Sequence, residues 1–394
     1  MSKVTNKWPF LSRQGGLITV LFLLSVVLFL YTWRLGTLTT GLSQAESASR
    51  QSSSSLDNII SDPTFAPHKL VQLGFQSAGQ SGAFWMRLSS VLFALALLLF
   101  FYTLLRLWFG RLVSLLGTML LAGTPFIILS ARSATPYILL LTPIALLASY
   151  VWFSKTDKKT LAWFTLMVVL GVALYTPGTI YFVLLGSLIF RKKLVHLLAP
   201  MRSWVVISLF AIPLLFMAPI VMASIENPSV VKSLMLIPSE LANSTEVMKS
   251  TAWAGLSLFW MTRDSHSLVI GRLPMLNALQ IVLGLFGLYA MWTRARRELY
   301  LLIGMFVLGI ITAGVFNNLL YLILSLPAAC ILSAAGLRYL YKEWRTVFPL
   351  NPLPKALAVL LMVTVVGLHL LIGTRYSLVA WPSTLATRST YVIK

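Results

Sequence analysis

Long apolar runs alternate with short polar segments along this chain. Eleven such runs lie near residues 17–33, 88–109, 112–129, 136–153, 161–174, 178–190, 204–224, 275–292, 299–316, 319–337 and 356–374. A helix needs about 20 mainly apolar residues to cross the hydrocarbon core of a bilayer. The pattern therefore predicts an all-α polytopic membrane protein with about eleven transmembrane helices. Residues 1–394 are expected to form a single integral-membrane domain.

The runs 161–174 and 178–190 could form one long helix, because only Tyr175-Thr176-Pro177-Gly178 separates them. The segment before the first run, residues 155–159, and the segment after the second run, residues 191–193, are both basic. Basic flanks gather on the cytoplasmic side of a membrane, so an even number of crossings must separate these two. We therefore expect a hairpin of two short helices with the Pro-Gly pair at its tip.

Positive charge also orients the chain. With a cytoplasmic N-terminus, 19 of the 31 Lys and Arg and three of the 10 acids fall on the inner side, as the positive-inside rule requires. The C-terminus then lies outside, and so do two long segments, 36–85 and 225–273. We expect these two loops to roof an outer cavity that holds the functional groups, because sites tend to lie on loops.

The composition agrees with a membrane protein. The chain is 58% apolar and 10% charged, with a mean hydropathy of +0.85, whereas soluble proteins are about 25% charged. Most of the net charge of +21 belongs to the cytoplasmic flanks, so it indicates topology and not a nucleic-acid partner. Cys330 is the one cysteine, which excludes an intrachain disulfide.

The sequence motifs of soluble enzymes are absent: the chain has no Walker loop, dinucleotide fingerprint, HExxH or paired CxxC. Glu46 is the first acid of the chain and lies early in the first outer loop. It could act as a general base toward an acceptor hydroxyl or help to bind a divalent cation. It could equally be a solvated acid in a Ser-rich loop, so a metal or other cofactor stays unknown.

Three cations are expected near the outer surface, beside this acid. Arg132 occupies a very short outer turn, Arg87 opens the second span, and Lys69 lies late in the first loop. Guanidinium and ammonium groups bind phosphate, so the three could hold the phosphate of an anionic lipid. The alternative is that each simply extends toward the membrane surface.

Aromatic and polar residues around these loops are candidate sugar or acceptor contacts. Trp253 and Trp260 lie in the second large loop, His68 precedes Lys69, and Tyr137 follows the short turn. Aromatic side chains near a bilayer edge are usually interface anchors. Their faces can also stack on sugar rings, so both interpretations stay open.

Several short motifs resemble the GT-C glycosyltransferases, and in particular the protein O-mannosyltransferase and aminoarabinose-transferase branch, in a short bacterial-type form. The motifs are Phe84-Trp85-Met86-Arg87-Leu88-Ser89-Ser90, Leu107-Trp108-Phe109-Gly110, Thr124-Pro125-Phe126, Ser130-Ala131-Arg132 and, in the first loop, Gly41-Leu42-Ser43 with Glu46. The likeness covers roughly residues 36–190. The order of these motifs along the chain is more specific than any single motif.

The resemblance implies a polyprenyl-phosphate-linked sugar as the donor and a protein or lipid as the acceptor, on the extracytoplasmic face of a membrane such as the bacterial plasma membrane. It gives Glu46 the catalytic acid position, and Lys69 and Arg132 become phosphate ligands. The chain departs from the family where Ala45 replaces the first acid of an Asp-Glu pair and where Tyr137 stands in place of an acid.

Two other functions compete with glycosyl transfer. The departures at Ala45 and Tyr137 would suit a non-catalytic relative that binds a lipid or serves as a partner subunit. The second competing function is transport of lipid-linked sugars. Transporters, however, commonly carry ionisable residues near the membrane midplane and contain internal repeats. The sequence shows no acid in the middle of a span and no internal repeat.

Overall fold

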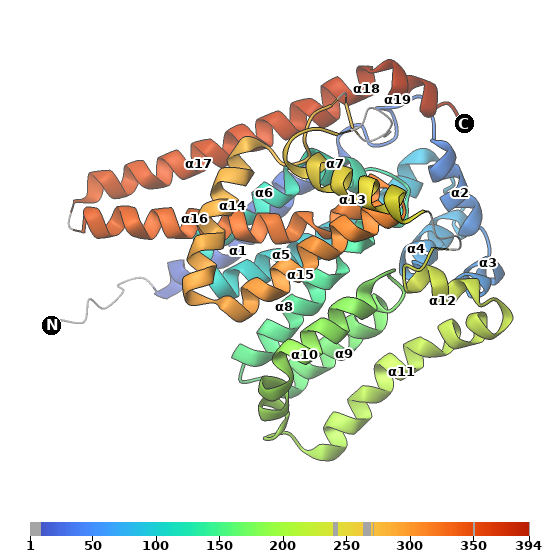
Figure 1. Ribbon diagram of the computed structural model, residues 1–394, viewed down its shortest axis with the longest axis horizontal. Coiled ribbons are helices and arrows are strands. Elements are labelled where there is room, and N and C mark those ends of the chain that lie inside the picture. Colours follow the sequence, from blue (N-terminus) through green and yellow to red (C-terminus); the bar gives the residue numbers. More distant parts are fainter. Residues whose placement is uncertain (1–8, 239–242, 263–268, 271, 350, 394) are drawn as a thin grey trace.

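The computed structural model describes residues 9–238, 243–262, 269–270, 272–349 and 351–393. Within these ranges every regular element is helical (Figure 1). The β-pairing in them is one isolated antiparallel bridge between Leu42 and Ile393. The predicted all-α class is therefore confirmed.

All eleven predicted apolar runs are helical. They correspond to α1 (Pro9–Thr32), α5 (Ala83–Phe109), α6 (Arg111–Ala122) with α7 (Pro125–Ala131), η1 (Pro136–Leu141) with α8 (Thr142–Lys155), α9 (Lys159–Ala173), α10 (Thr179–Leu198), α11 (Ser203–Glu226), α14 (Ala278–Arg294), α15 (Arg296–Val315), η2 (Leu319–Leu324) with α16 (Leu326–Val347), and α17 (Pro352–Arg375). The chain then continues through η3 (Tyr376–Ala380), α18 (Trp381–Ser383) and α19 (Leu385–Thr390).

The chain is an integral membrane protein, but the predicted count of about eleven spans is not confirmed. Among the described residues, six helices are long and apolar enough to cross a membrane. A seventh candidate is the pair α6 and α7, which is bent by 71°. The bend falls at Gly123 and Thr124, directly before Pro125. Other apolar helices, such as α9 with 15 residues and α14 with 17, are shorter.

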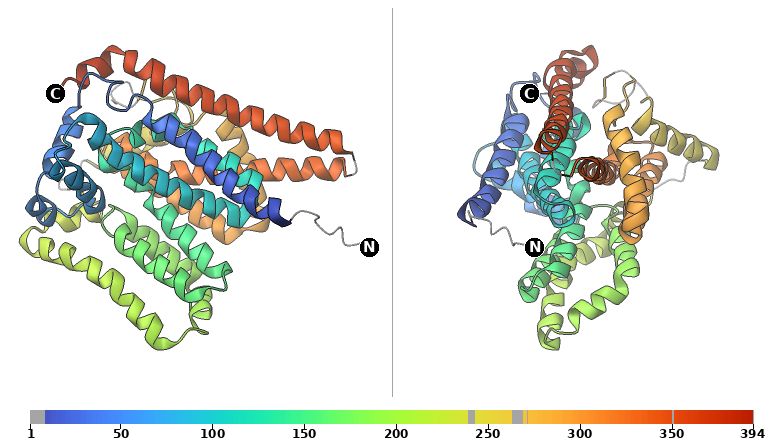
Figure 2. Two further views of the ribbon diagram at one scale, coloured as in Figure 1. Left: turned by 180° about the vertical axis from the view of Figure 1, so that it is seen from behind. Right: turned by 90° about the vertical axis from the view of Figure 1, so that its left-hand side faces the viewer.

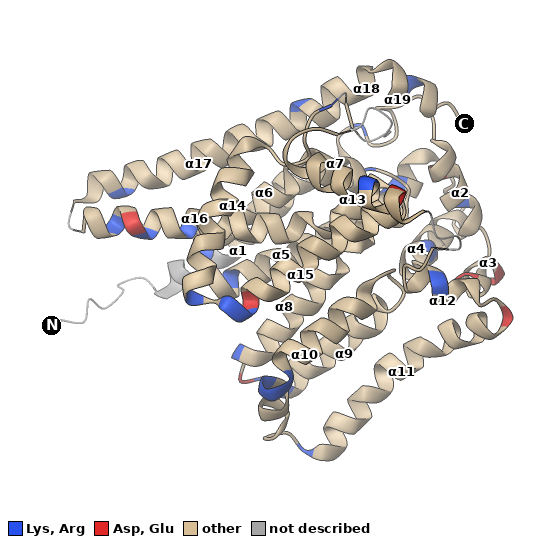
Figure 3. Cartoon of the chain, viewed as in Figure 1, with Lys and Arg blue, Asp and Glu red and all other residues tan. Residues whose placement is uncertain are grey.

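The segment 161–190 forms two helices, because the chain breaks between α9 and α10 at residues 174–178. Gly178 has a φ of +75°, which favours glycine over residues with a side chain. Residues 157–161 before α9 and the stretch 200–205 after α10 line one common pocket. The two basic flanks thus lie at the same end of the molecule, as the hairpin prediction requires. Figure 3 shows Lys and Arg concentrated at this end, around the ends of α8, α10 and α16.

The first predicted outer loop folds into three short helices at the other end of the bundle, α2 (Gln44–Ser52), α3 (Leu56–Ser61) and α4 (Ala66–Ser77). The second contains α12 (Ser229–Leu234) and α13 (Ser244–Phe259), and its residues 239–242, 263–268 and 271 lie outside the described ranges. Helix α13 packs along α15 (Figure 2).

Helix α1 packs beside α5. Because the first loop connects these two helices, it covers the end of the bundle where α1 ends and α5 begins.

Helices α14 and α16 pack closely against each other. A Cβ atom added to Gly287 would meet the carbonyl group of Leu332, and one added to Gly336 would meet that of Leu283. Small residues let helix backbones approach closely, which favours packing inside a membrane. The two glycines therefore set the distance between α14 and α16.

We predict that Gly287→Ala destabilises the protein, because its methyl group has no space beside Leu332. Overpacking of this kind typically costs about 1–3 kcal/mol. Thermal unfolding of the purified chain in detergent should show a lower midpoint. The matched control is Gly367→Ala in α17, where a Cβ atom meets nothing within 4 Å. Equal midpoints for the two variants would contradict the close packing.

Candidate functional site

Glu46 lies in the first turn of α2 and is buried, with 1% of its surface exposed. Its backbone N–H donates to Ser43 Oγ (3.2 Å), and its Oε2 accepts from the N–H of Ser43 (3.1 Å). This reciprocal pair is a capping box, which begins the helix and satisfies two of its free N–H groups. The carboxylate also lies at the positive end of the helix dipole.

Arg87 lies in the second turn of α5 and forms a bidentate ion pair with Glu46. Its Nε donates to Oε1 and its Nη2 to Oε2, each over 2.9 Å. The same guanidinium donates to the carbonyl groups of Leu35 (3.0 Å) and Gly41 (2.9 Å). Bidentate pairs are the strong form of charge-assisted hydrogen bond, and both side chains are buried.

The backbone N–H of Ala134 completes the surroundings of Glu46 by donating to Oε1 (2.9 Å). Each carboxylate oxygen thus accepts two hydrogen bonds, which uses the capacity of an ionised carboxylate. The donors come from the N-cap of α2, from α5, and from the turn between α7 and η1. Glu46 therefore joins three segments, and in this arrangement neither of its oxygens is free to accept a further proton donor.

Arg132, from that same turn, binds the C-terminal end of α1. Its Nη1 donates to the carbonyl groups of Leu30 (3.1 Å) and Tyr31 (3.0 Å), and its Nη2 donates to that of Trp33 (2.7 Å). A cation at a helix C-terminus is stabilised by the helix dipole. Burial, helped by the nearby Arg87 charge, lowers the pKa of Arg132 to about 10, so it stays protonated at neutral pH.

Glu46, Arg87 and Arg132 line one small cavity. Its volume is about 20 Å³, which is room for a single water molecule. The remaining lining residues are Leu35, Leu38, Thr39, Leu129, Ser133, Trp381 and Tyr391. The cavity is thus enclosed by the first loop and the C-terminal segment. The second large loop was expected to help roof it, but none of the residues that the structure describes in that loop is part of this lining.

The C-terminal segment is fastened to the first loop, near α2 (Figure 1). Leu42 and Ile393 exchange backbone hydrogen bonds of 2.7 and 3.1 Å, and Thr40 Oγ1 donates to the carbonyl group of Tyr391 (2.7 Å). The Arg87 guanidinium lies 5.7 Å from the centre of the Tyr391 ring, as in a cation–π contact. Tyr391 could not be predicted as part of this site, because nothing in the local sequence links residue 391 to residues 40–46.

Lys69 does not reach this cavity. It is buried on α4, where its Nζ donates to the carbonyl oxygen and to Oδ2 of Asp62, both over 2.7 Å. In this arrangement all three predicted phosphate ligands therefore have protein partners: Lys69 has Asp62, Arg87 has Glu46, and Arg132 has α1.

His68 is completely buried between α4 and α5. Its Nε2 lies 2.8 Å from Ser90 Oγ and 3.0 Å from Ser89 Oγ. Both hydroxyl groups donate their own protons to backbone carbonyl groups, those of Thr135 and Met86, so Nε2 must carry the proton. Nδ1 is left buried without a hydrogen-bond partner. Burial, with a smaller effect of Lys69, lowers the pKa of His68 to about 3, and the ring is neutral at physiological pH.

The other predicted contacts lie outside the cavity. The ring of Tyr137 packs edge-on against Phe65, with 6.3 Å between centres. Trp253 lies on α13, and Trp260 follows that helix with 76% of its surface exposed. In the part of the chain that the structure describes, no group of three or more His, Cys, Asp or Glu residues is placed to hold a metal ion.

We predict that Glu46 and Arg87 are strongly coupled in their contributions to the free energy of unfolding. Removing one partner of a buried ion pair leaves the other charge uncompensated, which costs about 3–5 kcal/mol. E46Q and R87Q should each lower the free energy of unfolding by this amount, and the double variant by clearly less than the sum. Denaturant unfolding in mixed micelles measures the cycle. Additive costs would show that the two charges do not depend on each other.

We predict that His68 makes the stability of the folded chain sensitive to acid. The pKa of His68 is about 3 in the folded chain, whereas an unperturbed histidine, as in the unfolded chain, has a pKa of 6.5. Between these pH values the unfolded chain therefore binds a proton that the folded chain does not. The free energy of unfolding should therefore fall as the pH drops through this window, by up to about 1.4 kcal/mol per pH unit. H68Q should flatten this slope in pH-dependent unfolding measurements. An unchanged slope would assign the effect to other groups.

Residues 65–225 match the family model described as dolichyl-phosphate-mannose-protein mannosyltransferase. The match contains Lys69, Arg87 and Arg132 and begins after Glu46. A search of curated proteins finds no match.

Solved structures extend the likeness to almost the whole chain. ArnT from Cupriavidus metallidurans in the apo state aligns with a TM-score of 0.61 and 16% identity over 96% of this chain and 78% of its own. The same protein bound to undecaprenyl phosphate aligns with a TM-score of 0.57 and 16% identity, over 95% and 76%. The archaeal oligosaccharyltransferase AglB from Archaeoglobus fulgidus, in complex with an inhibitory peptide and a dolichol-phosphate, gives 0.58 and 13% over 93% and 56%.

This chain thus spans little more than half the length of AglB. ArnT and AglB are membrane glycosyltransferases of the GT-C superfamily. The resemblance seen in the sequence is therefore confirmed, and this integral membrane protein has the GT-C fold.

Proposed function

We propose that this protein is a GT-C glycosyltransferase that moves a sugar from a polyprenyl-phosphate-linked donor to an acceptor. Transfer would take place on the extracytoplasmic face of a bacterial plasma membrane. One observation carries the proposal: Glu46, Arg87 and Arg132 line one buried cavity. The fold around it is that of ArnT, which has been solved bound to undecaprenyl phosphate.

The two arginines would bind the donor phosphate, because both keep unused donors. A guanidinium has five N–H groups. Arg132 uses three of them on the carbonyl groups of α1, which leaves its Nε and one N–H of Nη2. Arg87 uses four, which leaves one N–H of Nη1. Preorganised donors of this kind stabilise the charge that develops on a leaving phosphate.

Glu46 would act after the donor phosphate has drawn Arg87 away from it. Each of its oxygens would then lose one hydrogen bond and keep a backbone donor, Ser43 or Ala134. In the proposed step, an acceptor oxygen attacks the anomeric carbon of the sugar. The phosphate leaves with the electron pair of the broken C–O bond, and Glu46 takes the acceptor proton.

Donor binding also requires the cavity to enlarge. A volume of about 20 Å³ holds one water molecule, whereas a sugar phosphate is many times larger. Trp381 and Tyr391 enclose the cavity from the C-terminal segment, so displacement of this segment would open it. Lys69 is proposed as a third phosphate ligand, and His68, Tyr137, Trp253 and Trp260 as sugar or acceptor contacts once the site is open.

A second candidate is a non-catalytic GT-C protein that binds a lipid or a partner subunit. Two observations favour it: Glu46 accepts four hydrogen bonds from the protein itself, and the cavity holds only one water. Such a protein would bind polyprenyl phosphate but turn over no donor.

Donor turnover distinguishes the two candidates. Purified full-length protein in lipid nanodiscs would be given polyprenyl-phosphate sugars and a membrane extract as the source of acceptors, and release of polyprenyl phosphate would be measured. We expect E46Q to lower turnover at least about 100-fold, as for loss of a general base. The matched control is D57N, which removes the same charge from an exposed position in the same loop.

Stability must be separated from chemistry, because E46Q also strands the Arg87 charge. The double variant E46Q/R87Q should recover part of the unfolding free energy and still transfer no sugar. Wild-type turnover in E46Q would overturn the role of Glu46. Binding of polyprenyl phosphate by the wild-type protein, without turnover of any donor, would favour the non-catalytic candidate.

A further inference from the structure

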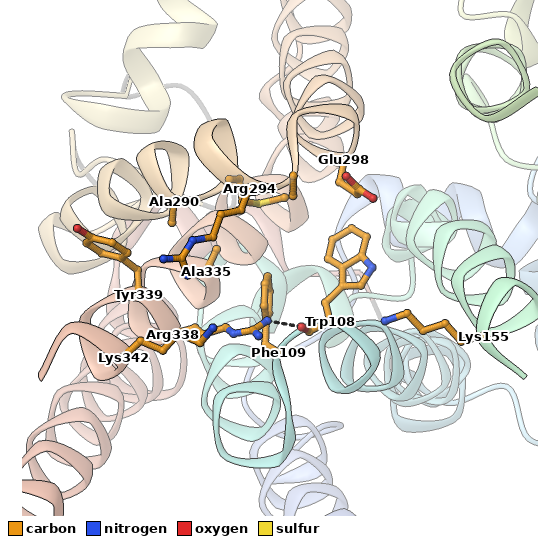
Figure 4. A pocket seen from close by; sticks show the side chains of 12 residues that line it. Trp108, Phe109, Lys155, Ala290, Arg294, Glu298, Ala335, Arg338, Tyr339 and Lys342 are labelled. Carbon is orange, nitrogen blue, oxygen red and sulfur yellow. Dashed lines mark hydrogen bonds between the residues drawn. The ribbon is translucent and has the colours of Figure 1, made fainter. Parts of the chain in front are cut away.

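A second, larger pocket lies at the opposite end of α5 (Figure 4). Its volume is about 260 Å³, and it is lined by residues from the ends of α5, α8, α14 and α15 and from the second half of α16. Trp108, in this pocket, follows Arg87 by 21 residues of one helix, which corresponds to about 31 Å. That distance matches the hydrocarbon thickness of a bilayer, about 30 Å, so the two sites would lie at opposite membrane surfaces.

The pocket is basic. Four cations and one acid line it: Lys155, Arg294, Arg338, Lys342 and Glu298. Figure 4 shows Glu298 and Lys155 on one side of Trp108, whereas Arg294, Arg338 and Lys342 lie on the other side with Tyr339. The acid is thus separated from the three grouped cations, and their positive charge has no neighbouring acid in the lining.

Two of the four cations have structural partners. Arg338 donates from Nη1 to the carbonyl group of Trp108, and its guanidinium lies 5.6 Å from the centre of the Phe109 ring. Lys155 donates to the carbonyl group of Leu107. These carbonyl groups belong to the last turn of α5, where cations are favoured by the helix dipole.

The other two cations have no such partner. Arg294, in the last turn of α14, and Lys342, on α16, make no hydrogen bond or ion pair with any residue in the described ranges. Both are exposed. Two cations that the fold does not use, next to a third that it holds in place, form a ready receptor for a phosphate group.

The rim of the pocket is aromatic and apolar. The ring of Tyr339 lies 6.4 Å from that of Phe286 and 5.6 Å from that of Tyr289. Phe286 and Tyr289 are 40% and 59% exposed on the outer face of α14, a helix of the membrane bundle. A ligand that places a phosphate on Arg294 and Lys342 therefore meets an apolar, membrane-facing surface directly beside it.

We propose that this pocket binds the phosphate of an anionic phospholipid, whose acyl chains lie over Phe286 and Tyr289. The site is independent of the proposed glycosyl transfer, because a bilayer thickness separates it from Arg87. Cytoplasmic leaflets carry anionic lipids, and the concentration of Lys and Arg at this end of the molecule (Figure 3) fits that leaflet.

Lipid binding by the purified full-length protein tests the proposal. Native mass spectrometry and thermal unfolding would be recorded with phosphatidylglycerol and, for comparison, zwitterionic phosphatidylcholine. We expect phosphatidylglycerol to be retained and to raise the unfolding midpoint, and R294Q/K342Q to weaken its binding at least about tenfold, because the variant removes both cations that would donate to the phosphate. Arg338 is left intact because it holds the end of α5.

The matched control is R297Q/K192Q, which removes one Arg and one Lys that are exposed and do not line this pocket. It should bind phosphatidylglycerol like the wild type. An equal loss in both double variants, or wild-type binding in R294Q/K342Q, would overturn the site. Protection by inorganic phosphate equal to that by phosphatidylglycerol would overturn the lipid assignment and identify free phosphate as the ligand. None of these measurements depends on sugar transfer.

Discussion

The buried ion pair between Glu46 and Arg87 is the constraint on which one end of the bundle depends, the end where α1 ends and α5 begins. An isolated charge in an apolar interior is very costly, so neither side chain can be buried there without the other. Because Glu46 comes from α2 and Arg87 from α5, the pair fixes the first loop on the membrane bundle. The N–H of Ala134, donated to Glu46, adds the turn that carries Arg132, and Arg132 in turn holds the end of α1. Three segments of the chain thus meet at one carboxylate, and Arg132 links a fourth, α1, to them.

The sequence predicted the parts of this arrangement but not their connections. Apolar runs predict helices because burial in a bilayer requires length and hydrophobicity, and all eleven runs are helical. Glu46, Lys69, Arg87 and Arg132 were expected near one another. Glu46, Arg87 and Arg132 do line one cavity, whereas Lys69 pairs with Asp62 instead. The partners of Glu46 and Arg132 could not be predicted, because they are distant in the sequence. Glu46 contacts Arg87 and Ala134, which are 41 and 88 positions away from it. Arg132 contacts Leu30, which is 102 positions away. No local pattern encodes such distances. The same holds for Tyr391, which reaches the first loop from the far end of the chain.

Charge is used differently at the two ends of the bundle. At the end covered by the first loop, the described cations of the site are buried and each has a protein partner, so the positive charge there stabilises the fold. At the other end, Lys155 and Arg338 hold the last turn of α5, whereas Arg294 and Lys342 have no hydrogen-bond or ion-pair partner among the described residues. Helix α5 joins both regions, with Arg87 near its first residue and Trp108 near its last. The cations behind the net charge of +21 are therefore of at least two kinds: those that bind other parts of the protein and those that do not. The sequence alone does not distinguish the two kinds.

The closed arrangement of Glu46 also bears on how a site of this kind can open. Leaving Arg87 without a counterion would cost several kcal/mol, but exchanging Glu46 for a phosphate replaces one bidentate charged pair with another. The released carboxylate would not be stranded, because two backbone N–H groups still donate to it. Such an exchange keeps Arg87 paired, but it leaves Glu46 with two backbone donors and no counterion, and it also requires the C-terminal segment to move. That segment is joined to the first loop by the β-bridge between Leu42 and Ile393 and by the hydrogen bond from Thr40 to the carbonyl group of Tyr391, and the Tyr391 ring also contacts Arg87. Trp381 and Tyr391 are both buried. A phosphate that enters the cavity would therefore have to displace these contacts, while the helices of the bundle can keep their packing.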